Sequence, residues 1–536
     1  MYFPLLYQLA KTMFVAILCV LVVTLILYLY RYFKKSHRYF EKYGIPCTKS
    51  HWYYGHMEDA IRCKKSYVMT LKELYEKSEP HRFVGLYTMQ RPAVMIRDPE
   101  LLKSILIKDF DHFHDHGVYY SKEAEPMSHN LFNMAGDEWK NLRIKLTCTF
   151  TSGKMKMMFP LVRKCAEDMK PVLNEYSSTP EGFDVKDFCA RYTTDVIGSC
   201  AFGVDTNSLQ NPDSEFRIMG RRIFETRWQG FVRAFFTNIP AWAIKFFGLE
   251  SIDKKVTDYF TKIIKDMVKF REKNNISRGD FLDILIGMKN RSKHTEKINK
   301  DQHEDVDFAK FMDQIGDKFV KNDVEMTLEL MAAQCLLFFI GGFEGTSATL
   351  TFLLFELSQH PDIQDKLREE IKTIIEKNDG QITYEILNKM PYLDMVIAEI
   401  LRKYALGAMI RKCTESFKIP ESNAVIEKDI VLFISTLGIH HDKKYYEKPD
   451  EFYPEHFTKE AINKRPNFAY LPFGDGPRIC IGERFAKMQV KLGAVHLLKD
   501  FSFELSPKTI VPLEFLPSFS FATNIKGGIW LKCRPL

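Results

Sequence analysis

The chain has 536 residues and a net charge of +7, and 46% of its residues are hydrophobic. This composition predicts a globular protein with a large core and excludes an intrinsically disordered chain. No Lys/Arg run resembles a nucleic-acid-binding tail, so we expect no nucleic-acid partner, and the 11 cysteines contain no CxxC pair that would indicate a zinc ribbon.

The first predicted element is a helix that crosses a membrane. Met13–Tyr30 carries no charged residue over eighteen positions, about the length needed to cross a hydrocarbon core of roughly 30 Å. Arg31, Lys34 and Lys35 follow it, whereas only Lys11 precedes it, so the positive-inside rule places the rest of the chain in the cytosol. A buried core helix is the alternative, but the asymmetric flanks and the terminal position argue against it.

Three regions are predicted from this pattern. Residues 1–30 form a membrane anchor, residues 31–60 a basic and aromatic linker, and residues 61–536 a single catalytic domain. Within the last region, the polar stretch Lys289–Asp323 is interpreted as a surface connection rather than a domain boundary.

The region 328–361 is predicted to form a long helix in the centre of the protein. Its apolar run is long enough to cross a membrane, but Glu329, Glu344 and Glu356 interrupt it too often. Short runs of β-branched and aromatic residues are candidate strands, namely Val94–Ile96, Ile430–Ile434 and Ile529–Leu531. We therefore expect a mainly α fold with small β-sheets, preceded by the transmembrane anchor helix.

Cys480 lies in the unusual stretch FGDGPRICIGER, among three glycines and two arginines. The nearest histidines do not fit zinc-finger spacing, so a four-ligand zinc site is disfavoured. A predicted helix over Gly482–Phe501 begins just after the cysteine, and such a position lowers the pKa of a thiol. A lone thiolate with nearby amides and the Arg478 cation is what an iron porphyrin with carboxylate groups requires. The alternative, an inert buried cysteine, is accepted for most of the other cysteines.

This loop resembles the haem-binding loop of the cytochrome P-450 superfamily, F-x-x-G-x-R-x-C-x-G, with all fixed positions matched by Phe473, Gly476, Arg478, Cys480 and Gly482. The resemblance implies haem b, with Cys480 as the axial thiolate ligand of the iron and Phe473 and Arg478 beside the cofactor. It covers essentially the whole chain, and Leu131–Phe159 is especially similar to microsomal insect members of the detoxification type.

A second motif, AEILR, supplies Glu399 and Arg402 on a predicted helix over Tyr392–Tyr404. The apolar stripe of this helix turns both side chains outward, so periodicity alone predicts a solvated pair. The resemblance to the superfamily's E-x-x-R helix implies instead a buried structural ion pair.

A third motif, EWKNLR, places Trp139 and Arg143 on one helical face. The resemblance implies that both bind a haem propionate, and that Arg411 does so as well, although its spacing is one residue short. Chance would instead give a solvated arginine beside a core tryptophan.

The central helix carries GGFEGTS, residues 341–347, which resembles the oxygen-activation segment [AG]-G-x-[DE]-T-[ST] with Glu344 as its acidic member. Each glycine inside a helix costs about 1 kcal/mol relative to alanine, which a local widening beside a ligand would justify. The usual threonine position is Gly345, so Thr346 or a water would have to take over proton delivery. The chain also departs from the superfamily at His456, which replaces an arginine and offers fewer hydrogen-bond donors.

The resemblance implies a haem-dependent monooxygenase anchored in the endoplasmic reticulum membrane. It would take electrons from an NADPH-dependent flavoprotein reductase or a cytochrome b-type donor and oxidise small lipophilic substrates, either xenobiotics or endogenous lipids. We expect basic residues to meet the acidic reductase, namely Lys140, Lys145 and Lys487. We expect apolar stretches to line the substrate pocket, namely Phe113–Leu131, Phe224–Phe247 and Leu406–Ile410.

Two alternative functions stay open from the sequence. The first is a haem-thiolate isomerase or dehydratase that needs no external electrons, which Gly345 in the threonine position would favour. The second is a non-catalytic binder that sequesters hydrophobic compounds.

Overall fold

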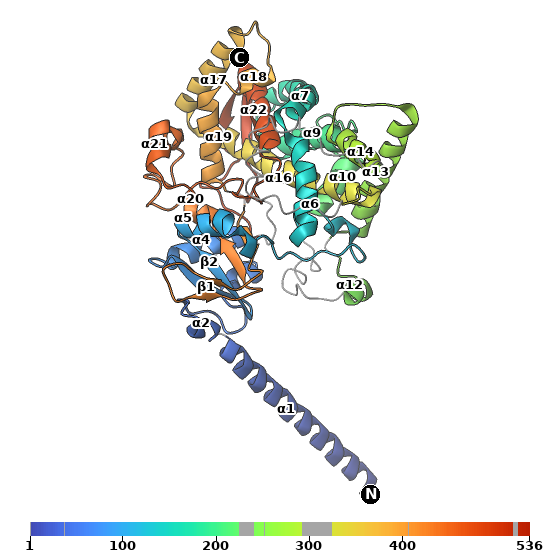
Figure 1. Cartoon of the computed structure of the whole chain (residues 1–536), viewed down its shortest axis with the longest axis vertical. Helices are drawn as coiled ribbons and strands as arrows, with labels where there is room; N and C mark the ends of the chain where they lie inside the picture. Colours follow the sequence, from blue (N-terminus) through green and yellow to red (C-terminus); the bar gives the residue numbers. More distant parts are fainter. Residues whose placement is uncertain are drawn as a thin grey trace.

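The architecture is mainly helical, and one long helix projects from one end of the body (Figure 1). Small sheets accompany the helices, which confirms the expected mainly α fold class. The structure is a computed structural model that describes residues 2–36, 38–224, 241–250, 252–291, 324–405, 407–517 and 524–536. Most of the polar stretch Lys289–Asp323 therefore lies outside the described residues.

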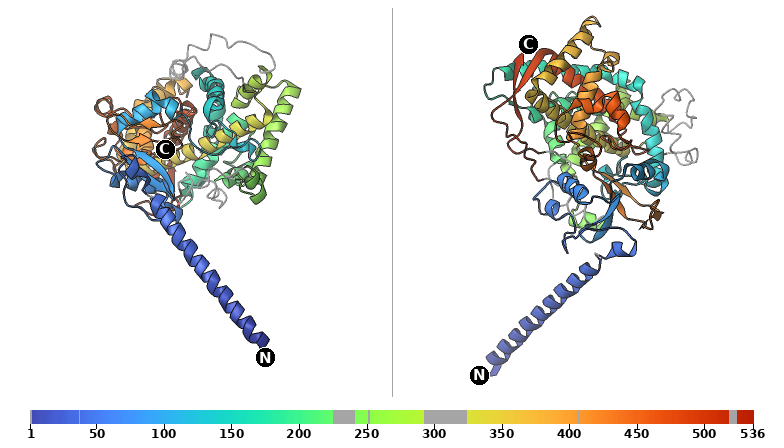
Figure 2. Two further views of the ribbon diagram at one scale, coloured as in Figure 1. Left: turned by 60° about the horizontal axis from the view of Figure 1, so that its bottom comes forward. Right: turned by 90° about the vertical axis from the view of Figure 1, so that its left-hand side faces the viewer.

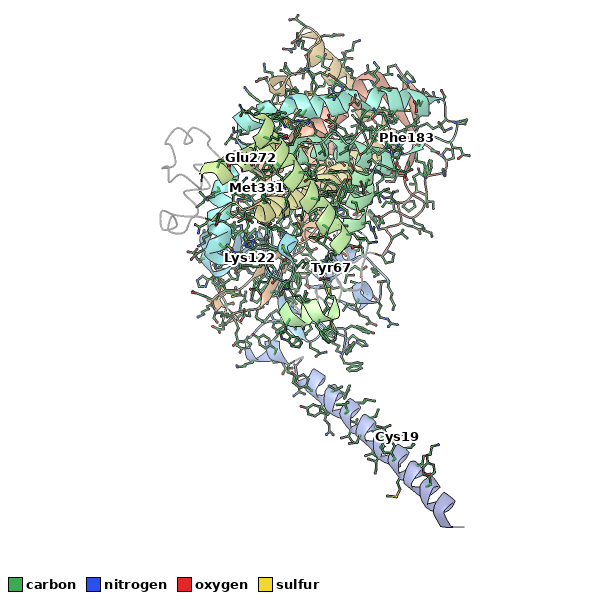
Figure 3. All side chains as sticks on the ribbon, turned by 90° about the vertical axis from the view of Figure 1, so that its right-hand side faces the viewer. Cys19, Tyr67, Lys122, Phe183, Glu272 and Met331 are labelled. Atoms are coloured by element: carbon green, nitrogen blue, oxygen red, sulfur yellow. The ribbon has the colours of Figure 1, made fainter. Side chains whose placement is uncertain are left out.

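The projecting helix is α1, Tyr2–Ser36. Its segment Lys11–Tyr32 is long and apolar enough to cross a membrane, and none of it is buried against the described chain. Figure 3 shows the side chains of this helix, including Cys19, standing clear of the body. This candidate span contains the predicted membrane-crossing segment Met13–Tyr30 and extends it by two residues at each end.

A four-stranded sheet, in the order β1-β2-β7-β4, forms the end of the body nearest α1, and the C-terminus lies at the far end (Figures 1 and 2). The parallel strands β2 and β7 pair Val94 with Leu432, so distant parts of the chain meet in this sheet. The other sheets are β3-β9-β8 and β5-β6. Of the three candidate strands, Val94–Ile96 lies within β2, whereas Ile430–Ile434 and Ile529–Leu531 each begin one residue before β7 and β9. The strands are Phe83–Thr88 (β1), Arg91–Ile96 (β2), Phe183–Asp184 (β3), Met409–Lys412 (β4), Phe417–Lys418 (β5), Val425–Ile426 (β6), Val431–Ile434 (β7), Phe501–Leu505 (β8) and Trp530–Pro535 (β9).

Residues 39–43, within the predicted linker, pack onto this sheet. Phe40 is buried in the same core as β1 and β2, and a side chain at Gly85 would collide with its ring. The hydroxyls of Tyr39 and Tyr43 both donate to the carboxylate of Glu427. The aromatic residues here therefore pack against the body close to the point where α1 leaves it, and the linker over residues 31–60 stays a prediction.

The helical part of the body is built around α16, Leu328–Gln359, which packs against α9, α13, α19 and α22. About two thirds of its most apolar window is buried, so it is the central core helix that the sequence predicts. The remaining helices are α2 (Tyr39–Lys42), α3 (Glu58–Ile61), α4 (Tyr67–Lys77), α5 (Pro99–Lys103), α6 (Gly136–Thr147), α7 (Ser152–Glu167), α8 (Met169–Ser177), α9 (Val185–Ile197), α10 (Glu215–Ile223), α12 (Ala241–Phe247), α13 (Lys254–Asn274), α14 (Phe281–Arg291), α17 (Pro361–Glu376), α18 (Tyr384–Leu387), α19 (Pro391–Lys403), α20 (Thr436–His440), α21 (Lys459–Lys464) and α22 (Glu483–Asp500).

Candidate active site

A cavity of about 480 Å³ lies where α6, α16, β4 and the loop before α22 meet. It brings together candidate residues from parts of the chain that are far apart in sequence. The candidates that line it are Trp139, Arg143, Thr346, Arg411, Phe473, Arg478 and Cys480.

The loop that carries Cys480 is held in shape by glycine and by the backbone. Gly476 has φ 74°, and a Cβ there would lie 1.9 Å from the carbonyl oxygen of Leu106, so only glycine fits. The amide of Cys480 donates to the carbonyl of Phe473 at 2.9 Å. This turn presents the sulfur to the cavity just before α22 begins at Glu483.

The protonation of Cys480 differs from the sequence expectation. The side chain is solvent-accessible because it opens into the cavity, but protein surrounds the site closely. Burial raises the pKa of the thiol above its ordinary value of 9.0, although the amide of Gly482 and the charge of Arg143 pull it down. The expectation of a lowered pKa is therefore wrong for the protein alone, because lost hydration outweighs the helix terminus and the nearby cation.

A second cysteine, Cys200, lines the same cavity, which the sequence did not indicate. Burial raises the pKa of its thiol well above 9.0, and the neighbouring Cys165 and Asp280 raise it further. Cys480, by contrast, has an amide and a guanidinium that favour its thiolate. Of these two cysteines, Cys480 is the better candidate for a metal ligand.

Three buried guanidinium groups, those of Arg143, Arg411 and Arg478, line the cavity. Burial lowers the pKa of Arg143 and of Arg411 to about 10, and burial together with repulsion from Arg411 lowers that of Arg478 to about 8. Asp115, 3.6 Å from Arg478, offsets part of this charge. The Nε of Arg411 has no hydrogen-bond partner among the described residues. So much buried positive charge suits a ligand that carries carboxylates.

Arg478 makes hydrogen bonds to the protein backbone that the sequence does not predict. Its guanidinium donates to the backbone carbonyls of His114, Leu131, Phe132 and Met134, at distances from 2.8 to 3.4 Å. It also lies 3.8 Å above the ring of Trp139. Arg478 therefore ties the Cys480 loop to residues 114–134 as well as facing the cavity.

His116 lines the same cavity; it lies within the expected pocket segment Phe113–Leu131 but was not singled out from the sequence. Its Nδ1–H donates to the carbonyl of Phe132 at 2.8 Å. Burial, with repulsion from Arg411 and Arg478, lowers its pKa well below 6.5, so the imidazole is neutral at physiological pH. No motif marks this residue, because only the folding of residues 114–134 over the cavity brings it there.

The glycines of α16 provide room beside the cavity. Gly341 and Gly345 line it, and a Cβ at either position would meet nothing within 4 Å. A Cβ at Gly342 would instead lie 2.4 Å from Ile197 of α9, so this glycine permits close helix packing. The helix is α-helical throughout, and the expected local widening is wrong.

Glu344 lies outside the lining of the cavity. Its carboxylate is 3.3 Å from the Nζ of Lys186, at the start of α9. Successive residues of an α-helix are rotated by about 100°, so Gly345 faces the cavity while Glu344 faces α9. Thr346, also buried, is on the cavity side.

Glu399 and Arg402 form a fully buried ion pair with N–O distances of 2.7 Å, not the solvated pair that periodicity predicts. Arg402 also donates to the carbonyls of His440, Pro449 and Glu451. His456 lies 3.1 Å from Glu399 through its Nδ1. Burial alone would raise the pKa of Glu399, but these partners outweigh it and lower the pKa from 4.5. The pair therefore connects α19 to residues 440–456.

Comparison with known proteins shows the family to which this arrangement belongs. A family model described as cytochrome P450 matches residues 45–531. The chain belongs to the cytochrome P450 family. It is 39% identical to cytochrome P450 6k1 of Blattella germanica, covering 95% of both chains. It is also 39% identical to probable cytochrome P450 6a18 of Drosophila melanogaster, covering 97% of this chain and 98% of the relative.

As a cytochrome P450, the protein is a haem-thiolate monooxygenase, an oxidoreductase with cysteine-ligated haem b. The cavity residues fit that cofactor. A thiol opens into the cavity, three buried guanidinium groups can bind the carboxylates of haem, and glycines leave space along the α16 wall.

Replacing Arg411 with methionine is expected to speed haem release from this P450 by about ten- to hundredfold. Methionine keeps much of the volume but would remove the charged hydrogen bond that we expect Arg411 to make to a propionate, which is worth about 1.5–3 kcal/mol. Haem transfer to apomyoglobin measures the rate. Arg163→Met, at an exposed arginine in an ion pair on α7, is the matched control. Equal release rates for the two variants would exclude the proposed contact.

Proposed function

We propose that this P450 takes two electrons from an NADPH-dependent flavoprotein reductase, with a cytochrome b-type protein as a second donor, and oxidises small lipophilic molecules. The observation that carries the proposal is the cavity. There Cys480 and three buried guanidiniums share one space with apolar walls from α16, including Leu337 and Phe338.

Different residues of the cavity would bind different parts of the haem. When bound, haem supplies the iron at which O2 is reduced and one oxygen atom passes to the substrate. Cys480 would hold the iron through its sulfur. Arg143 and Arg411 would hold the propionates, with Trp139 and Arg478 beside them and Phe473 against the ring.

Proton delivery would fall to two residues of α16. Thr346 would hold a water by its hydroxyl in the open space beside Gly345. Glu344 would supply protons from the α9 side of the helix, where it is paired with Lys186. Because Gly345 has no hydroxyl, water in that space has to complete the path.

The substrate class follows from the cavity walls. Leu131 and residues 407–410 line the cavity, which supports two of the three expected pocket segments. Of the third, residues 225–240 lie outside the described residues. The walls also include Ile397 and Leu401 of α19 and Phe150. With the three guanidiniums taken by the haem carboxylates, these apolar walls suit a neutral apolar substrate better than a charged one.

The proposed location is the cytosolic face of the endoplasmic reticulum membrane. α1 supplies the apolar span, and α12 lies at the same end of the body (Figure 1). Trp242, Phe246 and Phe247 of α12 are 69%, 78% and 60% exposed, as suits side chains that meet a lipid surface. The basic residues Arg31, Lys34 and Lys35, at the C-terminal end of α1, support a cytosolic position for the body.

The reductase-binding surface needs a correction. Lys140 is buried and lies 3.6 Å from Asp111, and Lys145 donates to the carbonyl of Val324. Only Lys487 of the three expected lysines is exposed, on α22 close after Cys480. The proposed contact with an acidic reductase therefore rests on Lys487 and not on the two α6 lysines.

Turnover of lipophilic compounds is expected only when reductase, NADPH and O2 are all present. The haem-loaded full chain in lipid, incubated with a panel of such compounds, provides the measurement by mass spectrometry. Product that gains one oxygen atom supports the proposal.

Two results would point to the alternatives instead. Product formed equally well without reductase and NADPH would indicate an isomerase or dehydratase. Tight binding of compounds without turnover, and no gain of turnover in Gly345→Thr, would indicate a sequestering binder.

A further inference from the structure

A second cavity, of about 1050 Å³, adjoins the candidate haem cavity. Among the described lining residues, the two share only Ala405. Its walls come from α4, the C-terminal ends of α16 and α19, the start of α17, residues 437–455, residues 511–516 and Asn524. None of the residues assigned to the proposed reaction lines it. The proposed reaction therefore does not explain why a cavity of this size is present.

The walls of the second cavity are rich in aromatic rings. The rings of Phe352 and Tyr404 stack in parallel, with centroids 4.0 Å apart and an angle of 2° between their planes. The ring centroids of Phe515 and Phe352 are 6.3 Å apart. The side chain of Phe515 is 38% exposed, and that of Val511 is 51% exposed. Apolar side chains that are open to water on a cavity wall favour an apolar ligand.

The lysines that line the second cavity are paired with carboxylates. Glu356 is buried, accepts from Lys403 at 2.7 Å and accepts the hydroxyl of Tyr404. Lys366 lies 3.7 Å from Glu455 and 3.9 Å above the ring of Tyr392. Lys72, the third lysine of the lining, lies 3.6 Å from Glu76. Each lining lysine therefore has a carboxylate partner, and a carboxylate ligand would face Glu356 and Glu455.

We propose that the second cavity binds a neutral, lipophilic small molecule with an aromatic ring, independently of the substrate held beside Cys480. Its volume matches the upper end of ordinary ligand pockets. The ring of the ligand would pack against the Phe352–Tyr404 stack, and its remaining apolar part would cover Val511 and Phe515. This binding goes beyond the proposed oxidation and does not require it.

Photolabelling with benzophenone tests the proposal on the haem-loaded full chain in lipid. A bulky aryl imidazole first fills the haem cavity, and its absorption shift shows that it stays there. Ultraviolet light then attaches benzophenone to whatever it contacts, and peptide mapping finds the site. We expect saturable labelling of peptides that contain Met69 or residues 352–363, which unlabelled neutral aromatic compounds suppress.

A tryptophan that fills the cavity provides the decisive variant. Val511→Trp is expected to reduce this labelling at least tenfold, because the residue lies at the exposed mouth and the indole would occupy the space. Ile363→Trp, on the α17 wall, should do the same. Ile462→Trp, on α21 and outside the cavity, is the matched control and should label like the parent.

Three results would overturn the proposal. They are an absence of saturable labelling at these peptides, equal labelling of Val511→Trp and Ile462→Trp, and equal labelling by the anionic 4-benzoylbenzoate. The aryl imidazole shift is measured in every variant and reports an intact haem site. A failure of labelling with that shift preserved would therefore count against the second cavity and leave the proposed oxidation standing.

Discussion

Replacing Cys480 with alanine is expected to abolish the thiolate-type spectrum of the reduced, carbon monoxide-bound protein and to leave no measurable turnover. The sulfur of Cys480 opens into the cavity, with the Gly482 amide and Arg143 favouring its anionic form. Alanine offers no donor in its place. The difference spectrum of the purified full chain, reconstituted with excess haem, provides the measurement.

Cys200→Ala is the matched control, because Cys200 is the other cysteine that lines the same cavity. We expect this variant to keep the thiolate-type spectrum. Cys480→His would separate the two effects further, since a nitrogen donor can hold the iron without a thiolate's electron donation. A Cys480→Ala protein that keeps the spectrum, together with a Cys200→Ala protein that loses it, would reverse the assignment.

Replacing Glu399 with glutamine is expected to destabilise the protein by about 3–5 kcal/mol, the usual effect of leaving one member of a buried ion pair uncompensated. Arg402 is fully buried, and its five N–H groups are all used, two of them on Glu399. A neutral amide cannot balance that charge. Thermal denaturation, followed by loss of the haem spectrum, measures the change.

The control for this variant is Glu167→Gln, because Glu167 pairs with Arg163 on the exposed surface of α7, where the expected change is below about 1 kcal/mol. The pKa of Glu399 is lowered from 4.5, so its stabilising effect is present above pH 4.5 and is lost as the pH falls through the lowered folded-state value. The difference between parent and Glu399→Gln should therefore stay constant from pH 8 to 5 and shrink in stronger acid. A small, pH-independent difference would contradict the structural role.

Local patterns predicted the parts of the site that are built locally. The Cys480 loop depends on glycines at fixed steps, and the Trp139 and Arg143 pair depends on one turn of helix, so both are readable from a short window of sequence. The core helix α16 was also readable, because its acidic residues exclude a lipid environment. These features require no knowledge of the partner segment.

Features that depend on residues far apart in the chain could not be predicted from the sequence. Periodicity places Glu399 and Arg402 on the polar side of α19, but residues 440–456 cover that side and bury the pair. Likewise, Lys140 looks like a surface lysine, and only the fold brings Asp111 over it. Cys200, His116 and the second cavity arise from the same cause, since each is defined by segments that meet only in three dimensions.

The contact between Arg143 and the carbonyl of Ile479 joins residues 336 positions apart. Translation proceeds at about 5–20 residues per second, so the ribosome needs on the order of 20 to 70 seconds to make the chain between them. During that interval the anchor has already emerged, whereas Cys480 has not yet been made. With Cys480 as the proposed iron ligand, the complete haem site can form only when synthesis of the chain is nearly finished.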